Sequence, residues 1–257
     1  MTGVQTCALP IGVVDETLSP EIVELLGKAI APEALAQGQV TLCIGYDGRL
    51  SSSDYAEALI NGVISTGMNA ILIGQVPTPV LYFATHHFET GSGVVITGSH
   101  KPANYNGFKM MIGRTTLSGE GIHKLYNRNV MQDFVGGQGE RSEEKIYREY
   151  LDNILTNFIT NSVRYKDPKR KPIITLSAVK KNNYSILTIA DNGLGIDLEK
   201  HGKKLFGMYK TFHEHKDAKG IGLYITKNQI DAMNGKVEVT SKVGKGTEFK
   251  IFFNDKI

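Results

Sequence analysis

The stretch GVVITGSHKPANYNGFK, residues 93–109, decides how the first half of the chain is interpreted. It opens with β-branched apolar residues that predict a buried strand, and it then becomes small and polar. Gly98 and Gly107 permit tight backbone turns. Ser99 offers a hydroxyl group, and His100 and Lys109 can donate or accept a proton. The composition alone fits either a polar turn or a reactive loop.

Outward from this stretch, apolar runs typical of strands alternate with helical patterns. Ser19 and Pro20 mark the start of the first helix, and Ser53 or Asp54 is expected to cap the second. We expect a mainly parallel sheet with helices on both faces, a three-layer α/β domain. Ligands of such folds bind beyond the carboxyl ends of the strands, where Ser99 lies. The strand-like runs are residues 40–47, 69–75 and 92–98, and the helical patterns are residues 19–30, 53–67, 79–88 and 117–128.

Two short segments of the loop carry a specific resemblance. TGSHKP at residues 97–102, followed by NGFK at residues 106–109, closely resembles the phosphoserine loop of the α-D-phosphohexomutases, the phosphomannomutase/phosphoglucomutase family. Lys101 stands where that family usually has Asn. The segments GYDGRLSS (45–52) and GQVPTPVLYFA (74–84) also fit the bacterial branch of the family.

The resemblance implies a role for each polar residue of the loop. Ser99 would carry the phosphoryl group exchanged with a hexose phosphate and would contact the magnesium ion, as in enzymes that interconvert hexose 1- and 6-phosphates. His100 and Lys109 would be the acid/base groups, and Arg49 a supporting charge. Phosphoryl transfer depends on such positioning and on cations that neutralise the phosphate oxygens. The family's acidic magnesium loop and sugar-recognition loops are not found, so we expect no mutase turnover.

From Tyr147 onward the pattern changes to a second unit. Residues 150–165, YLDNILTNFITNSVRY, place apolar residues at helical spacing and predict an amphipathic helix. Asn157 and Asn161 lie four residues apart on one flank of this helix. Two exposed polar residues and a ligand-binding pair are both compatible with that spacing.

The segments that follow are more specific. Residues 172–181 and 184–192 alternate as a strand pair, and residues 235–253 form another around a glycine turn. Between the two pairs, DNGLGID (191–197) allows a close backbone approach, and KGIGLYITK (219–227) places glycines at a helix start, where free N–H groups attract phosphate. These strands and helices predict an α/β sandwich.

The order Asn-x3-Asn, Asp-x-Gly-x-Gly, Gly-x-Gly-Leu resembles the ATP-binding catalytic domain of sensor histidine kinases, within the gyrase-like GHKL ATPases. By that resemblance the second Asn would hold magnesium against the phosphates, the acid would accept a hydrogen bond from the adenine amino group, and the later glycines would lie under the phosphates. The matching residues are Asn157, Asn161, Arg164, Tyr165, Asp191, Gly193, Gly195, Gly220, Gly222, Leu223 and Thr247.

The resemblance also implies cofactors and partners. ATP and Mg²⁺ would be the cofactors, with the nucleotide bound in the second unit and a hexose phosphate in the first. A dimerisation domain and a response regulator belong to the parent kinase in two-component signalling. No helix pair with a phosphoacceptor His-Glu precedes Asn157, so we expect ATP binding without autophosphorylation in this chain.

Charge divides the chain in the same place. Residues 1–140 contain 7 Lys and Arg against 12 Asp and Glu, whereas residues 141–257 contain 22 against 14. The basic residues of the second half are interleaved with acids, which favours a solvated surface over a nucleic-acid partner. Two cysteines form no disulfide framework or metal motif, and no apolar run is long enough to span a membrane. These observations predict a cytoplasmic protein.

The leader MTGVQTCALPI, residues 1–11, and the segment RSEE, residues 141–144, have a different interpretation. Back-translated, the first resembles a widely used short-read sequencing adapter, and the second resembles the start of the complementary adapter. We therefore divide the chain into a non-native leader (1–11), a mutase domain (12–140), a junction (141–146) and a kinase ATPase domain (147–257). The hypothesis is that adapter sequence joins two unrelated gene fragments.

Amplification of the source DNA across codons 130–155 tests this hypothesis. We expect no continuous product that lacks adapter sequence, because the two fragments would come from separate genes. A single continuous product without adapter bases would overturn the hypothesis.

Overall fold

A computed structural model describes residues 11–207 and 222–254. The chain divides into two compact units, residues 1–147 and 148–257, and the division falls in the first turn of a helix. Each unit is described by itself. Apart from Ile11, the expected leader lies outside the described residues, as does Gly220 of the expected phosphate-binding segment.

The first unit contains one seven-stranded sheet in the order β1-β5-β4-β2-β3-β7, with β6 beside β5. Pairing is parallel from β4 through β2 and β3 to β7, and antiparallel where β5 meets β4, β1 and β6. The strands are β1 (Ile11–Val13), β2 (Thr41–Tyr46), β3 (Asn69–Gln75), β4 (Gly93–Ile96), β5 (Tyr105–Ile112), β6 (Thr115–Thr116) and β7 (Arg141–Glu143). The helices are α1 (Pro20–Leu35), α2 (Ser52–Ile64), α3 (Thr78–His87) and α4 (Glu120–Met131).

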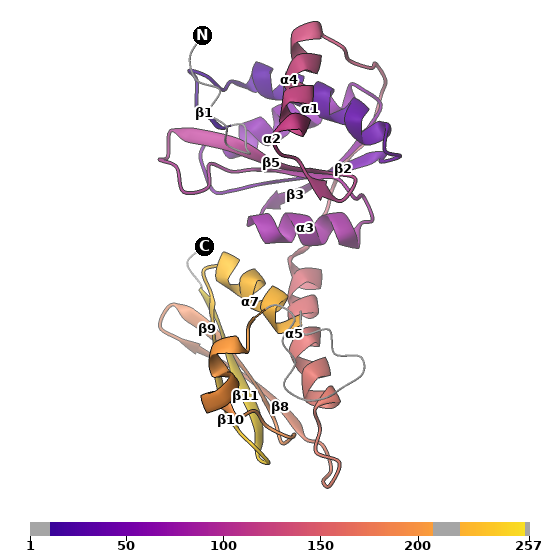
Figure 1. The fold of residues 1–257 in the computed structure, drawn as a ribbon. Coiled ribbons are helices and arrows are strands. Elements are labelled where there is room, and N and C mark those ends of the chain that lie inside the picture. Colours follow the sequence, from indigo (N-terminus) through magenta and orange to yellow (C-terminus); the bar gives the residue numbers. More distant parts are fainter. Residues whose placement is uncertain (1–10, 208–221, 255–257) are drawn as a thin grey trace. The chain divides into compact units, whose positions relative to one another are not determined.

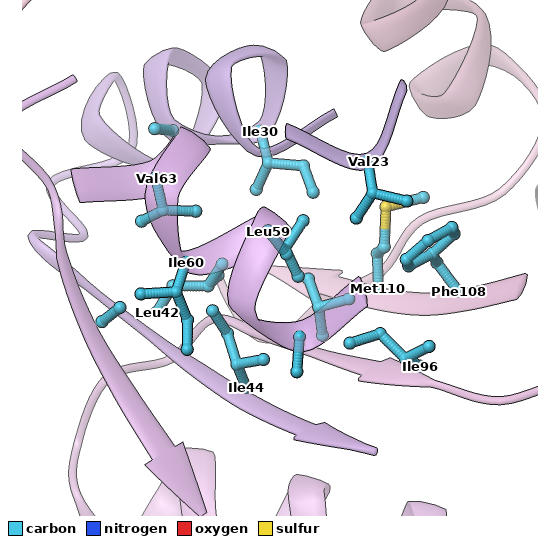
Figure 2. Close-up of a cluster of buried hydrophobic side chains, with 14 of the residues drawn as sticks. Val23, Ile30, Leu42, Ile44, Leu59, Ile60, Val63, Ile96, Phe108 and Met110 are labelled. Carbon is cyan, nitrogen blue, oxygen red and sulfur yellow. The ribbon is translucent and has the colours of Figure 1, made fainter. Parts of the chain in front are cut away.

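Helices cover both faces of this sheet, so the expected three-layer architecture is confirmed. Figure 1 shows α1, α2 and α4 on one face and α3 on the other. The core between α1, α2 and the sheet is built from aliphatic side chains with Phe108 and Met110 of β5 (Figure 2). Helices α1 and α2 cross closely because neither has a side chain at the crossing: a Cβ on Gly62 would lie 2.1 Å from the Glu24 carbonyl oxygen, and one on Gly27 would lie 2.5 Å from that of Leu59.

The strand β5 is a departure from the sequence-based expectation, which treated residues 97–109 as a loop. Phe108, Met110 and Ile112 are buried at alternate positions, which is the period of a strand. The glycine and asparagines that precede them obscured this signal. The cap of α2 also differs: the N-cap is Ser51, two or three residues before the expected Ser53 or Asp54. Ser52 already lies in the helix, and its hydroxyl donates to Asp47 at 2.7 Å.

The last strand of the first unit is β7, which takes up the first three residues of the expected junction, 141–146. The chain reaches it through Gly137 and Gly139, whose N–H groups donate to the carbonyls of Ser65 and Ile64. A Cβ on Gly139 would lie 2.0 Å from the Met68 carbonyl oxygen, so this approach requires glycine. Beyond the strand, the chain buries the side chain of Ile146, which is 1% exposed.

The second unit is a two-layer α/β sandwich with a separate antiparallel sheet in the order β10-β11-β9-β8. Helices α5 and α7 lie against it (Figure 1). Phe158 of α5 packs on Phe249 of β11 with ring centroids 4.9 Å apart. Both predicted strand pairs are present. The elements are α5 (Tyr147–Arg164), β8 (Ile174–Lys181), β9 (Tyr184–Asp191), α6 (Leu198–His201), the 3-10 helix η1 (Gly202–Lys204), α7 (Gly222–Ala232), β10 (Lys236–Lys242) and β11 (Gly246–Asn254).

A nearly buried carboxylate ties α4 to α1 in the first unit. Glu33 accepts hydrogen bonds from Lys124 at 2.6 Å and from Arg128 at 2.7 Å, and its side chain is 11% exposed. Burial alone would raise the pKa of Glu33, but the hydrogen bonds and positive charges of its two partners outweigh burial and lower the pKa below its ordinary value.

We predict that Glu33→Gln lowers the free energy of unfolding by about 1.5–3 kcal/mol at neutral pH, since charge-assisted hydrogen bonds are lost. Because the folded-state pKa is lowered, this stabilisation is complete above the ordinary value of about 4.3 and is lost as pH falls through the folded-state pKa. Urea unfolding of both proteins at a series of pH values below neutral should therefore show the difference shrinking as Glu33 becomes protonated.

The control is Glu57→Gln, because Glu57 pairs with Arg141 but its side chain is 48% exposed. Exposed pairs contribute about 1 kcal/mol or less. Equal losses from the two variants at neutral pH would contradict the role assigned to Glu33.

Candidate functional site

The loop that follows β4 presents Ser99 at the surface. Ser99 is exposed and adopts a left-handed backbone conformation with φ of 53°, which non-glycine residues rarely adopt. Its N–H donates to the Thr97 hydroxyl at 3.0 Å. The nucleophile expected from sequence is therefore solvent-accessible and held in an unusual conformation.

The guanidinium of Arg49 holds the backbone of this loop. It has five N–H donors: Nε donates to Asp47 at 3.2 Å, and the two terminal nitrogens donate to four carbonyl oxygens. The side chain is 15% exposed. The structure thus joins Arg49 to Ser99 through the Ser99 carbonyl rather than through its hydroxyl. The four carbonyls belong to Ser99 (3.1 Å), Lys101 (2.7 Å), Pro102 (2.5 Å) and Tyr105 (2.9 Å).

Asp47, at the end of β2, completes the support of the loop. One of its oxygens accepts from Arg49 Nε and from the Gly98 N–H at 3.3 Å, and the other accepts from Ser52 at 2.7 Å. Gly98 can approach because it lacks a side chain: a Cβ there would lie 2.4 Å from Cζ of Arg49. Asp47 belongs to the segment that carried the family resemblance, but its contacts were not foreseen from sequence.

The other expected groups of this site lie around the loop. His100 and Lys101 are exposed, and Lys109 is half-buried on β5, with its Nζ 3.5 Å from the Thr78 hydroxyl. Asn106 is fully buried and donates to the Ser51 and Ser52 hydroxyls. Lys109 is opposite Val95 on β4, which places it beside the strand that leads into Ser99.

In the second unit, Asp191 at the end of β9 joins three segments. Its Oδ1 accepts from the backbone N–H of Gly193 at 2.9 Å and of Thr247 at 3.2 Å, and its Oδ2 accepts from the Ser162 hydroxyl at 2.9 Å. A carboxylate offers about four lone-pair positions. Within the described part of the chain, Oδ2 therefore keeps one acceptor position open. Ser162, next to Asn161 in sequence, was missed in the sequence analysis.

Two glycines that follow Asp191, Gly193 and Gly195, allow the loop after β9 to pack closely. A Cβ on Gly193 would lie 2.5 Å from the Tyr165 carbonyl oxygen, and one on Gly195, at φ of 71°, would lie 2.1 Å from that of Lys242. The Leu194 N–H also donates to the Tyr165 carbonyl at 2.9 Å. The two glycines thus allow the loop after Asp191 to pack directly against the backbone of Tyr165 and Lys242.

The two asparagines of α5 lie one turn apart, and both are half-buried. Asn157 donates to the buried Thr226 hydroxyl of α7 at 3.0 Å. At the start of α7, a Cβ on Gly222 would be in van der Waals contact with Asn157 Oδ1 at 3.7 Å, the nearest atom among the described residues. The helix start therefore lies against Asn157, with Asn161 one turn further along α5. Leu223 follows Gly222 and is half-buried.

Arg170 was not anticipated from sequence. One terminal nitrogen donates to the Gly193 and Gly244 carbonyls, both at 2.8 Å, and its Nε lies 3.3 Å from Asp167. It lies in the charged run KDPKRKP, which gave only the signal of a solvated segment. Arg164, by contrast, is exposed at the end of α5.

Searches for a metal cluster and for a membrane span found neither among the described residues. Within residues 11–207 and 222–254, no three His, Cys, Asp or Glu side chains gather closely enough to hold a metal ion. None of the helices in the same part of the chain has the length and apolar composition that crossing a membrane requires.

Comparison with known proteins identifies both units. The sequence model of the family "Phosphoglucomutase/phosphomannomutase, alpha/beta/alpha domain I" matches residues 11–129. That of the "Histidine kinase-, DNA gyrase B-, and HSP90-like ATPase" family matches residues 147–257. The chain therefore combines a segment similar to phosphohexomutase domain I with a segment similar to the histidine kinase-like ATPases. We refer below to the mutase domain and the ATPase domain.

The mutase domain has relatives of substantial identity. The chain is 43% identical over 159 residues to a phosphoglucomutase of Neisseria meningitidis, covering 61% of this chain and 34% of that protein. It is 41% identical over 143 residues to a phosphomannomutase/phosphoglucomutase of Pseudomonas aeruginosa, covering 56% and 31%. A phosphoglucomutase/phosphomannomutase family structure from Burkholderia thailandensis matches with a TM-score of 0.56 and 33% identity, covering 58% of this chain and 34% of that one. The chain spans about one third of the length of the curated relatives it matches.

The similarity to the mutases extends beyond the motifs of the loop. A match covering 61% of 257 residues is about 157 residues long, which exceeds the 140 residues that precede Arg141. The ATPase family model begins at Tyr147. The two similarities therefore overlap in α5.

Proposed function

We propose that the ATPase domain binds Mg-ATP, as the nucleotide-binding part of a histidine kinase. The observation that carries this proposal is the geometry of Asp191. Its carboxylate is fixed by two backbone N–H groups and the Ser162 hydroxyl, and it retains one acceptor position for a donor such as the adenine amino group. Because its partners come from three segments, the carboxylate cannot turn away without breaking all three bonds.

The phosphate end of the nucleotide would lie at the start of α7. Helix N-termini carry free N–H groups that favour anions, and Gly222 at the start of α7 lies next to the amide oxygen of Asn157. The amide oxygen of Asn161 suits Mg²⁺, which prefers oxygen ligands and is usually held by few protein groups together with substrate phosphates. The residues present thus fit both nucleotide and metal, and the metal would supply charge neutralisation on the phosphates.

A second function is favoured by the loop at Ser99. We propose that the Ser99 hydroxyl accepts a phosphoryl group from a hexose phosphate of the kind used by phosphoglucomutases and phosphomannomutases in carbohydrate metabolism. In this step the Oγ–P bond forms and the P–O bond to the sugar breaks, while the serine hydroxyl proton passes to a base such as His100 and the sugar oxygen takes up a proton from an acid such as Lys109. The positive charges of Lys101 and Lys109 would stabilise the phosphate oxygens.

The setting of both activities would be the cytoplasm. Cys43 is a free thiol that is fully buried, and burial raises its pKa to about 11. A buried, protonated thiol is unreactive and needs no oxidising compartment. A response regulator and a dimerisation domain would be the partners of the parent kinase.

For the ATPase domain we predict that Asp191→Asn weakens ATP binding about 10- to 100-fold, since a hydrogen bond to a charged group is worth about 1.5–3 kcal/mol. The loss should be specific for the base. Wild type should prefer ATP over ITP, which lacks the amino group, and the variant should bind both equally weakly. Titration calorimetry with each nucleotide measures this preference.

Asp231→Asn is the matched control, because Asp231 is an acid of the same domain that pairs with Lys227 on the exposed side of α7. It should leave both affinities unchanged. Asn161→Ala should weaken ATP binding in Mg²⁺ and have little effect in EDTA. Equal affinity of wild type, Asp191→Asn and Asn161→Ala would refute the proposed nucleotide site.

For the mutase domain we predict that incubation with a hexose bisphosphate and Mg²⁺ adds one phosphoryl group to the wild-type protein and none to Ser99→Ala. Intact-mass spectrometry and peptide mapping locate the group. We expect no net interconversion of glucose 1- and 6-phosphates. Phosphorylation of Ser99→Ala to the wild-type extent would refute the role of Ser99.

A further inference from the structure

The contacts of Arg49 lead to an inference about how Ser99 is made reactive. We propose that Arg49 is a positioning residue, which holds the loop so that the Ser99 hydroxyl faces solvent, and that it does not bind the transferred phosphate. The inference rests on the proposed phosphoryl transfer to Ser99. It also makes a separate claim, that Arg49 maintains the conformation of the loop from Ser99 to Tyr105.

The first argument is the number of donors. A guanidinium has five N–H groups, and all five of Arg49 are used: one on Asp47 and four on loop carbonyls at 2.5–3.1 Å. A phosphate could gain a contact with Arg49 only by displacing a carbonyl, which would leave that carbonyl without its partner. Because each of these bonds fixes one point of the loop, a phosphate that took a donor away from a carbonyl would loosen the loop that presents its own acceptor hydroxyl.

The second argument is the conformation that these bonds maintain. Ser99 has a φ of 53°, a region that costs free energy for a residue with a side chain. The surrounding bonds must therefore hold it there. The four carbonyls span Ser99 to Tyr105, so one planar cation fixes the curvature of the whole segment. Gly98 leaves room for the guanidinium, since a Cβ would lie 2.4 Å from its central carbon.

The third argument is charge. The cation of Arg49 is paired with Asp47, so its field at the loop surface is largely compensated. Lys101 on the same loop is exposed and has no such acidic partner among the described ion pairs. Lys101 and Lys109 are therefore better placed than Arg49 to neutralise a phosphate on Ser99, whereas Arg49 determines the shape of the loop.

The test compares Arg49→Lys and Arg49→Ala with wild type in the full chain. Two quantities are measured: amide hydrogen exchange of Lys101 and Tyr105, whose N–H groups donate to Gly98 and Pro102 at 3.0 Å, and the rate at which Ser99 takes up a phosphoryl group from a hexose bisphosphate. We expect faster exchange at both amides and a phosphorylation rate reduced about tenfold or more in both variants, because small displacements of a reacting group are costly. Lysine should not substitute, since it has three donors and no planar fork.

Two further measurements separate a positioning role of Arg49 from a general destabilisation of the domain. Methylguanidinium added to Arg49→Ala should restore part of both signals, and methylammonium should restore neither. Arg141→Ala is the matched control, because Arg141 makes bonds only to the exposed carboxylates of Glu57 and Glu143. It should match wild type in loop exchange and phosphorylation.

The outcomes are distinct. Wild-type exchange in both variants would overturn the inference, and so would a slower phosphorylation with unchanged exchange, which would mean that Arg49 acts on the phosphate directly. If wild type itself takes up no phosphoryl group, the proposed reaction at Ser99 fails. In that case the hydrogen exchange of the Lys101 and Tyr105 amides, and its recovery on addition of methylguanidinium, still decide whether Arg49 holds the loop.

Discussion

Backbone groups that leave the end of a strand lose their partners in the sheet, and they must find others if the loop is to be ordered. Each domain meets this constraint with one ionised side chain. In the mutase domain a cation, Arg49, gathers four carbonyls, and in the ATPase domain an anion, Asp191, gathers two N–H groups and a hydroxyl. Both candidate sites lie at strand ends and depend on these ionised groups, because order in the loop places each functional atom.

The two ionised groups differ in whether they keep a hydrogen-bonding position free for a ligand. All five donors of Arg49 are used, one on Asp47 and four on the carbonyls of the loop, so its contribution to chemistry is indirect. Asp191 keeps one acceptor position open, so the same group can both organise its surroundings and contact a ligand. A residue that matches a motif can thus act on the ligand or only on the protein, and the count of unused donors or acceptors distinguishes the two cases.

Much of the fold could be predicted from sequence because its signals are local. The alternation of strands and helices, the start of α1 at Pro20 and both strand pairs of the ATPase domain follow from period and turn residues. The order of the sheets, the strand β5 and the contacts of Asp47, Ser162 and Arg170 could not be predicted, because they depend on residues 23 to 74 positions apart meeting in space. Single charged residues in polar segments give no sign of which distant carbonyl they will bind.

The strand β7 is held in the sheet by its backbone. The Ala70 N–H donates to the Glu140 carbonyl and the Glu144 N–H to that of Leu72, both at 2.9 Å, while its three side chains are exposed. This segment therefore pairs with the sheet through its extended backbone and the small residues that precede it. Its exposed side chains contribute little to that pairing. The edge of the mutase domain is thus tolerant of substitution: an extended segment with other side chains could complete the sheet at β7 without disturbing the fold that carries Ser99.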